Sequence, residues 1–187
     1  MTSCGQTNAK TSDDNSDLES GVIECLNVEY EKSDVELEEV RQIFESYFAK
    51  GGITKASDTK AKQYQDILNF WERPTMQFPM FEDKSKVAEM AQRLSLNQAD
   101  IMQKNQLRCL ANIYEKNEAT IDTLSSLATF GAILSTVKQV PNVSPGLIAG
   151  GLNLAMQKDD LDKELYQNAI ALMYLFDMSL FLTDGKN

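Results

Sequence analysis

The sequence predicts an all-α protein, an irregular bundle of six to eight helices around a buried C-terminal helix. Three observations indicate this class. Apolar residues recur at spacings of three and four along most of the chain, which is the period of a helix with one buried face. Prolines and glycine pairs separate these periodic segments. Residues 160–182 are apolar nearly all round, as expected for a helix at the bundle centre.

The length of 187 residues fits one domain with a buried core. Residues 1–17 are almost wholly polar and predict a disordered tether, which leaves residues 18–187 as a single helical domain. Directly after the tether, residues 18–30 fit a helical spacing, although residues 22–26 also suit a short strand.

The clearest helix lies between Ser33 and Gly51. Ser33 and Glu36 have the spacing of a capping box, and acidic residues crowd the first turn, where the helix dipole favours them. One apolar face contains Leu37, Val40, Phe44, Tyr47 and Phe48. The pair Gly51-Gly52 is expected to end this helix.

A second helix is expected at about residues 57–71, ended by Pro74. Its apolar side contains Ala61, Tyr64, Ile67, Leu68 and Trp71. The two prolines in residues 73–82 exclude regular structure there. The apolar residues of this segment either plug the core or form an exposed contact loop for a partner; they are Met76, Phe78, Met80 and Phe81.

Four further helices are expected: from about residue 83, over 98–116, over 119–140, and over a short glycine-rich segment. The last of these begins at Ser144-Pro145, which is typical of an N-cap followed by proline at the first helical position. Its glycines, together with Gly131, predict a close helix–helix crossing because glycine lets backbones approach.

The C-terminal helix is expected at about residues 160–182. Acidic residues at its start suit the capping of its own free amides: Asp159, Asp160, Asp162 and Glu164. Asp177 interrupts the apolar run within it and needs a partner if it is buried. A capping or ion-pairing role is expected, with a functional acid as the alternative.

The net charge of −10 is unevenly distributed, because residues 1–50 contain twelve acidic residues and four basic ones. Such a charge repels phosphate backbones and anionic membranes, which makes nucleic acid an unsuitable partner, whereas a basic protein suits it. The candidate contact surface is an acidic helix face formed by Glu36, Glu38, Glu39 and Glu45. A solvated face that only keeps the chain soluble is the alternative.

The residue types argue against an enzyme. The chain has no histidine, which removes the usual general base and the commonest metal ligand, and it has no glycine-rich phosphate loop. A hydrolase that uses two carboxylates remains as a remote alternative. Residues 13–24 imitate the spacing of a calcium-binding loop, but Leu18 replaces the required glycine. We therefore expect neither a metal nor a cofactor.

The chain opens with Thr2-Ser3-Cys4-Gly5, preceded by Met1. This segment resembles the end of a lipobox followed by the first residues of a mature bacterial lipoprotein. The resemblance implies that Cys4 carries a lipid anchor in the cell envelope, in the periplasm or at the outer membrane. Cys25 and Cys109 can then form a disulfide. In the alternative, a cytoplasmic protein, both stay buried free thiols.

The expected envelope lipoprotein is acidic, helical and of moderate size, and it has no catalytic residues. In these properties it is similar, at the level of class, to immunity proteins that neutralise secreted bacterial toxins. The resemblance implies a non-enzymatic protein that binds a basic toxin. The longest apolar run, residues 169–182, is too short to cross a bilayer, so the lipid is the expected membrane contact. A structural or accessory lipoprotein of an envelope assembly is the alternative function.

Overall fold

The computed structural model describes residues 20, 36–73, 84–93, 108–117, 126–140 and 143–183. These residues form seven α-helices and one short 3-10 helix, without a strand among them. The elements are α2 (Leu37–Lys50), α3 (Lys60–Trp71), α4 (Lys84–Arg93), α6 (Arg108–Asn117), α7 (Ser126–Gln139), α8 (Pro145–Ala155), η1 (Asp160–Asp162) and α9 (Glu164–Thr183). The predicted all-α class is confirmed.

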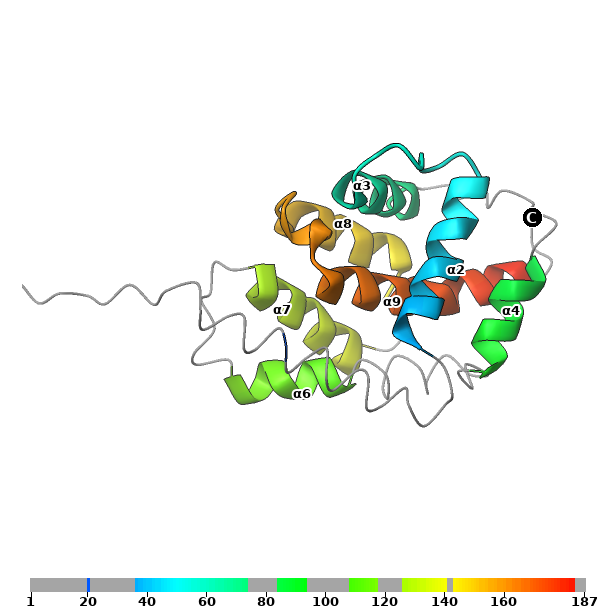
Figure 1. The fold of residues 1–187 in the computed structure, drawn as a ribbon. Coiled ribbons are helices and arrows are strands. Elements are labelled where there is room, and N and C mark those ends of the chain that lie inside the picture. Colours follow the sequence, from blue (N-terminus) through cyan, green and yellow to red (C-terminus); the bar gives the residue numbers. More distant parts are fainter. Residues whose placement is uncertain are drawn as a thin grey trace, which may run out of the picture.

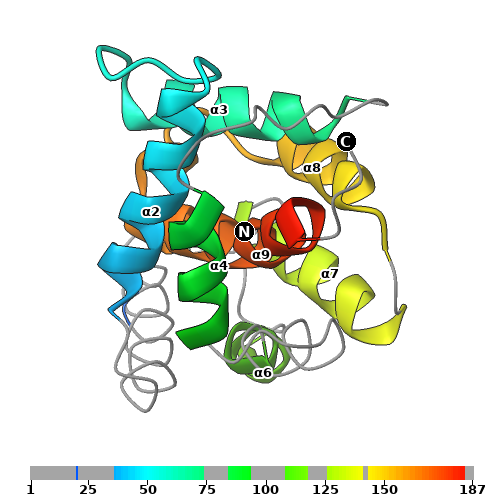
Figure 2. The ribbon, with the colours of Figure 1, turned by 90° about the vertical axis from the view of Figure 1, so that its right-hand side faces the viewer.

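The C-terminal helix α9 is the centre of the fold. Figure 1 shows α9 running through the middle of the molecule, and Figure 2 looks along it with the other helices arranged around it. Every residue from Leu165 to Leu175 is buried. The predicted buried C-terminal helix is therefore confirmed, and its all-round apolar character follows from having neighbours on every side.

The first described helix, α2, begins three residues later than a cap at Ser33 requires. Glu36 has extended backbone angles (φ −83°, ψ 138°) and is itself the N-cap, so the predicted Ser33–Glu36 capping box is wrong. A capping box needs Glu36 inside the first helical turn. The end of α2 is as predicted, because Gly51 is the C-cap and Gly52 has a left-handed φ of 69°. The predicted apolar face of α2 is buried along its whole length.

Two side chains cap α3, and one of them is remote in sequence. The Thr59 side chain accepts a hydrogen bond from the Lys62 amide at 3.3 Å. Asp162, in η1, accepts another from the Ala61 amide at 2.8 Å. The acidic residues before α9 were expected to cap α9 itself, so for Asp162 the structure corrects the prediction. Its carboxylate satisfies the free amides of a different helix.

The C-terminal helix also begins later than predicted, because the acidic residues before it form contacts with other elements. Residues 160–162 form the separate turn η1, and α9 begins only at Glu164. The Asp160 carboxylate accepts hydrogen bonds from the Gln157 amide, at 3.1 Å, and from the Ser126 hydroxyl on α7. Asp160 therefore joins the α8–α9 connection to α7 by hydrogen bonds and is not part of the first turn of α9.

Two of the glycines, Gly131 of α7 and Gly146 of α8, lie at close crossings as predicted, whereas Gly150 and Gly151 have only ordinary spacing to Glu72 and Ile133. A methyl group added to Gly131 would lie 2.0 Å from the Tyr114 ring of α6, so the ring rests directly on the α7 backbone. A methyl group at Gly146 would lie 3.2 Å from the Trp71 carbonyl oxygen of α3. A side chain at Gly131 would thus collide with the Tyr114 ring, and one at Gly146 would require the Trp71 carbonyl to move by a few tenths of an ångström.

Candidate functional site

The four glutamates of the predicted acidic face do not share one surface. Glu36 and Glu38 are exposed, and Glu38 accepts a hydrogen bond from Gln42 at 3.0 Å. Glu39 and Glu45 are only partly exposed, and each is engaged by a neighbouring helix. The expectation that all four face solvent is therefore wrong for Glu45, whose side chain is 15% exposed, whereas the Glu39 side chain is 39% exposed and paired with Arg93. The exposed acidic surface of α2 is limited to its N-terminal end.

Glu45 belongs to a polar network that joins α2 to α3. The Tyr64 hydroxyl donates to Glu45 Oε1 at 3.1 Å, and the Lys60 ammonium contacts Glu45 Oε2. Tyr64 is fully buried, and this burial, reinforced by the negative charge of Glu45, raises the pKa of Tyr64 well above its ordinary value. The hydroxyl therefore remains a hydrogen-bond donor, and Glu45 has a structural role in this position.

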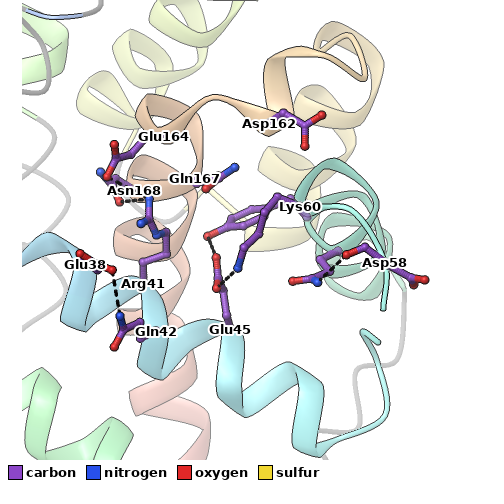
Figure 3. A network of polar contacts seen from close by, with 12 residues as sticks. Glu38, Arg41, Gln42, Glu45, Asp58, Lys60, Asp162, Glu164, Gln167 and Asn168 are labelled. Atoms are coloured by element: carbon purple, nitrogen blue, oxygen red, sulfur yellow. Dashed lines mark hydrogen bonds and ion pairs between the residues drawn. The ribbon is translucent and has the colours of Figure 1, made fainter. Parts of the chain in front are cut away.

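The same network reaches α9 through Arg41. Figure 3 shows Arg41 and Glu45 extending from α2 toward α9 and α3, whereas Glu38 and Gln42 bond to each other along α2. Arg41 Nη1 lies 3.1 Å from Glu164 Oε1 and 3.5 Å from Asn168 Oδ1. Asn168 is buried, so the guanidinium supplies a partner for its amide oxygen.

On its other side, α2 forms a groove with α4. The two helices lie side by side in both views (Figures 1 and 2), and the cavity between them has a volume of about 470 Å³. The apolar part of its lining consists of Ile43, Tyr47, Val87 and Met90. Three of these side chains are buried and Ile43 is half-buried, so they form the base of the groove. The cavity is open to solvent along the exposed residues Gln42 and Ser46.

Charged side chains border this groove at both ends. Glu39, near the start of α2, pairs with Arg93, the last residue of α4, at 2.6 Å (Oε1–Nη1) and 3.2 Å (Oε2–Nη2). The two helices therefore run antiparallel, and Lys50 and Lys86 lie toward the opposite end. With Glu89, the lining contains three cations and two carboxylates. In a chain of net charge −10, this groove is a locally less acidic surface.

The groove combines apolar and charged side chains. Burial raises the pKa of Tyr47 to about 12, so its hydroxyl stays protonated near neutral pH. Glu39 is held by Arg93, and Glu89 is exposed on α4. An apolar base with charged ends suits the side chains of a polypeptide, which combine an apolar anchor with flanking charges.

Asp177 lies on α9, next to an aromatic cluster. Burial raises the pKa of this half-buried carboxyl to about 7. One turn earlier, the Tyr174 ring stacks on Trp71 with centroids 4.5 Å apart, and its hydroxyl donates to the Pro145 carbonyl at 3.1 Å. Asp177 forms no ion pair or hydrogen bond with another described residue, so the predicted ion-pairing role has no support among them.

Several predicted sites lie outside the described residues. They are the lipid-anchor residue Cys4, the tether 1–17, the ambiguous strand at 22–26, Cys25, and the apolar loop residues Met76, Phe78, Met80 and Phe81. Cys109 falls within α6, but its proposed partner Cys25 does not belong to the described part. The disulfide, the anchor and the contact loop therefore stay predictions.

The groove on the α4 side was not found from the sequence. Its charged residues Lys86, Glu89 and Arg93 recur at spacings of three and four, which places them on one side of α4. This spacing predicts a charged face on α4. It could not identify α2 as the helix across the groove, because helical periodicity shows which residues share a face and not which element packs against that face.

The described residues contain neither a candidate metal site nor a membrane-spanning helix. Within the described ranges, no group of three or more cysteine, aspartate or glutamate side chains is placed to hold a metal ion. Among the described helices, none has both the length and the apolar content that crossing a membrane requires. Comparison of the chain with protein-family models, with curated proteins and with solved structures gives no match.

Proposed function

We propose that this protein acts by binding another protein, and that the groove between α2 and α4 is the contact site. The observation that carries the proposal is an open cavity of about 470 Å³ with an apolar base and charged ends. Ile43 is the partly exposed apolar side chain of the lining, and Val87 and Met90 are buried in the base of the groove because α4 packs on α9. A partner needs only to place an apolar side chain between the helices.

The charges around the groove suit an orienting role. Glu36 and Glu38 are exposed just before the groove begins, and they attract a basic partner toward the N-terminal end of α2. The Glu39–Arg93 pair closes that end of the groove and leaves no isolated charge there. Long-range attraction by exposed carboxylates and short-range burial in the groove are then separate steps of binding.

An immunity protein that neutralises a secreted bacterial toxin is the form of this function that we favour. The lipobox-like Cys4 directs such a protein to the cell envelope, where the toxin arrives, and the net charge of −10 suits a basic toxin. The groove then covers or distorts a loop of the toxin. Neither a cofactor nor a catalytic residue is needed for this role.

One observation favours the alternative of a structural or accessory lipoprotein in an envelope assembly. The α8 surface exposes two leucines, Leu147 and Leu154, as expected for a subunit that contacts others. The gene neighbourhood separates the two functions, because an adjacent toxin gene supports immunity and an adjacent assembly operon supports the accessory role.

Protection from the toxin tests the proposal. Cells exposed to the secreted toxin encoded beside the gene are supplied with the protein, and the affinity for that toxin is measured by calorimetry. We expect the unchanged protein to protect. We expect Ser46→Trp, which fills the groove from an exposed position, to lower affinity by about 100-fold and to abolish protection.

The matched control is Thr136→Trp, which places the same ring on an exposed hydroxyl-bearing position of α7. It should bind and protect as the unchanged protein does. If Ser46→Trp also binds normally, the groove is not the contact site. If capture from the native envelope recovers an assembly subunit and no secreted effector, the immunity role is wrong.

A further inference from the structure

The groove between α2 and α4 is elongated. Its α2 wall runs from Glu39 to Lys50, a rise of about 16 Å, and its α4 wall runs from Lys86 to Arg93, a rise of about 10 Å. The lining positions of α2 recur at spacings of three and four, so they form one stripe along that helix; they are Glu39, Gln42, Ile43, Ser46, Tyr47 and Lys50. A groove of this shape fits a rod-shaped occupant better than a compact one.

The middle of the α2 wall carries no charge. Gln42, Ile43 and Ser46 line this part of the groove. The charged residues in the same stretch of α2, Arg41 and Glu45, extend toward α9 and α3 (Figure 3). An apolar side chain of an occupant can therefore pack on Ile43 without desolvating a charged group of α2.

The two ends of the groove carry opposite charges. Lys50 and Lys86, both exposed, form a positive end. Glu36 and Glu38 are exposed just beyond the other end, where the ion pair between the two helices adds no net charge. On α4, exposed Glu89 lies about one turn from Lys86 in the direction of this negative end. An occupant of complementary charge therefore has an acidic end and a basic end.

The backbone of the occupant is limited by what the groove can bond. The described part of the molecule contains helices and no strand, so it has no sheet edge to which an extended segment can add. An extended segment on the apolar base would leave backbone N–H and C=O groups without partners, which costs free energy. A helix satisfies its own backbone and presents a stripe of side chains, so the groove favours a helical occupant.

Resting on the proposed function, we infer that the partner segment bound in this groove is an amphipathic helix of about three turns, with its acidic end at Lys50 and Lys86 and its basic end at Glu36 and Glu38. Its apolar stripe packs on Ile43 between those ends. Acidic residues are favoured in the first turn of a helix and basic residues in the last, because of the helix dipole. The bound helix therefore runs parallel to α4 and antiparallel to α2.

A synthetic peptide of about 14 residues tests this inference. The peptide has leucines along one face, glutamates in its first turn and lysines in its last turn, and a hydrocarbon staple holds it helical. It carries a fluorophore at its basic end and a benzophenone cross-linker at its acidic end. Fluorescence anisotropy with the full chain measures the affinity, and mass spectrometry locates the cross-links. We expect a dissociation constant of about 10–100 µM and cross-links beside Lys50 and Lys86.

Reversing the positive end should weaken peptide binding. Lys50→Glu combined with Lys86→Glu should lower the affinity at least about tenfold, because the acidic end of the peptide then meets carboxylates. The matched control, Lys116→Glu combined with Lys158→Glu, makes the same change in net charge at exposed positions outside the groove. At about 0.15 M salt it should lower the affinity less than about twofold, since distant charges are screened. Circular dichroism verifies the fold of every variant.

Exchanging the two ends should turn the peptide around. Glu36→Lys and Glu38→Lys, added to the variant with the reversed positive end, should restore the affinity to within about threefold of the unchanged protein. The cross-links should then move to the N-terminal end of α2. Ser46→Trp, which fills the groove, should abolish peptide binding in every background.

Three results would overturn the inference. They are the absence of peptide binding near about 1 mM, equal weakening by the groove variant and its control, and cross-links of the unchanged protein at the N-terminal end of α2. The toxin measurement with Ser46→Trp separates such a failure from a failure of the proposed function. If that variant loses the toxin although the peptide does not bind, the groove is the contact site and its occupant is not an amphipathic helix. If that variant keeps the toxin, the proposed function is wrong as well.

Discussion

Two sets of helix junctions in this molecule are built by different means. The polar junction joins α2 to α3 and α9 through Arg41, Glu45, Lys60, Tyr64 and Glu164. The glycine junctions, where α6 meets α7 and where α3 meets α8 and α9, rely on rings and bare backbone: Trp71, Tyr114, Gly131, Gly146 and Tyr174.

The two kinds of junction have different roles: the polar junction determines orientation, and the glycine junctions hold the helices together by close packing. A buried hydrogen bond contributes little net free energy to folding, because it replaces a hydrogen bond that the unfolded chain makes to water. It depends on direction, however, and is lost if α2 rotates. Close packing contributes in proportion to the apolar area buried and tolerates no added volume. We therefore expect the glycine junctions to be the more sensitive to mutation, and the polar junction to determine the direction in which α2 presents its groove.

The largest expected effect is the loss of the Trp71 ring. Trp71 is fully buried and stacks on Tyr174, so Trp71→Ala leaves a cavity at the meeting point of three helices. We expect it to lower the free energy of unfolding by about 3–5 kcal/mol, measured by urea denaturation. Trp71→Phe keeps a ring and should cost clearly less. Equal losses for both variants would contradict a role for shape at this junction.

A smaller loss is expected where α6 crosses α7. In Gly131→Ala the added methyl group meets the Tyr114 ring, while alanine improves helix propensity by about 1 kcal/mol, which offsets part of the strain. The net destabilisation should be about 1–2 kcal/mol. In a Tyr114→Ala background the same change should be neutral or stabilising. A double-mutant cycle measures this coupling, and additive effects would show that the ring and the glycine do not touch.

Asp177, one turn after Tyr174 on α9, should make stability depend on pH. Its pKa is raised from 3.8 to about 7, so the folded state holds a proton that the unfolded state releases. Stability should therefore fall as pH rises from about 4 to about 7. Asp177→Asn removes this dependence and should stabilise the protein at pH 8 by about 1–3 kcal/mol, a range that allows for the partial exposure of the side chain. A parallel pH dependence in both proteins would assign it to other groups.

The smallest effect is expected in the polar junction. Tyr64→Phe removes the hydroxyl that donates to Glu45 and leaves the ring and the Lys60–Glu45 contact in place. We expect a loss of about 0.5–1.5 kcal/mol in the free energy of unfolding. A loss above about 3 kcal/mol would mean that this junction supplies cohesion as well as orientation.

The parts of the fold that were predictable are those that a single helix determines. The faces of α2 and α3 were read from spacings of three and four, and the same residues are buried in the structure. Gly131 was expected at a close crossing, although its partner Tyr114 was not named. Of the candidate site, only the exposed positions Glu36 and Glu38 were placed as expected. The groove itself was missed, because no pattern within α2 indicates that α4 lies beside it.

What the sequence by itself determined is the helical class, the buried C-terminal helix and the residues that each helix hides, because these follow from local periodicity and composition. Only the tertiary structure decided how the polar residues are used. Asp162 caps α3 across 101 positions of sequence, and Glu45 turns toward Lys60 and away from solvent. A carboxylate accepts a hydrogen bond from any donor within reach, and which donor is within reach depends on how the helices pack.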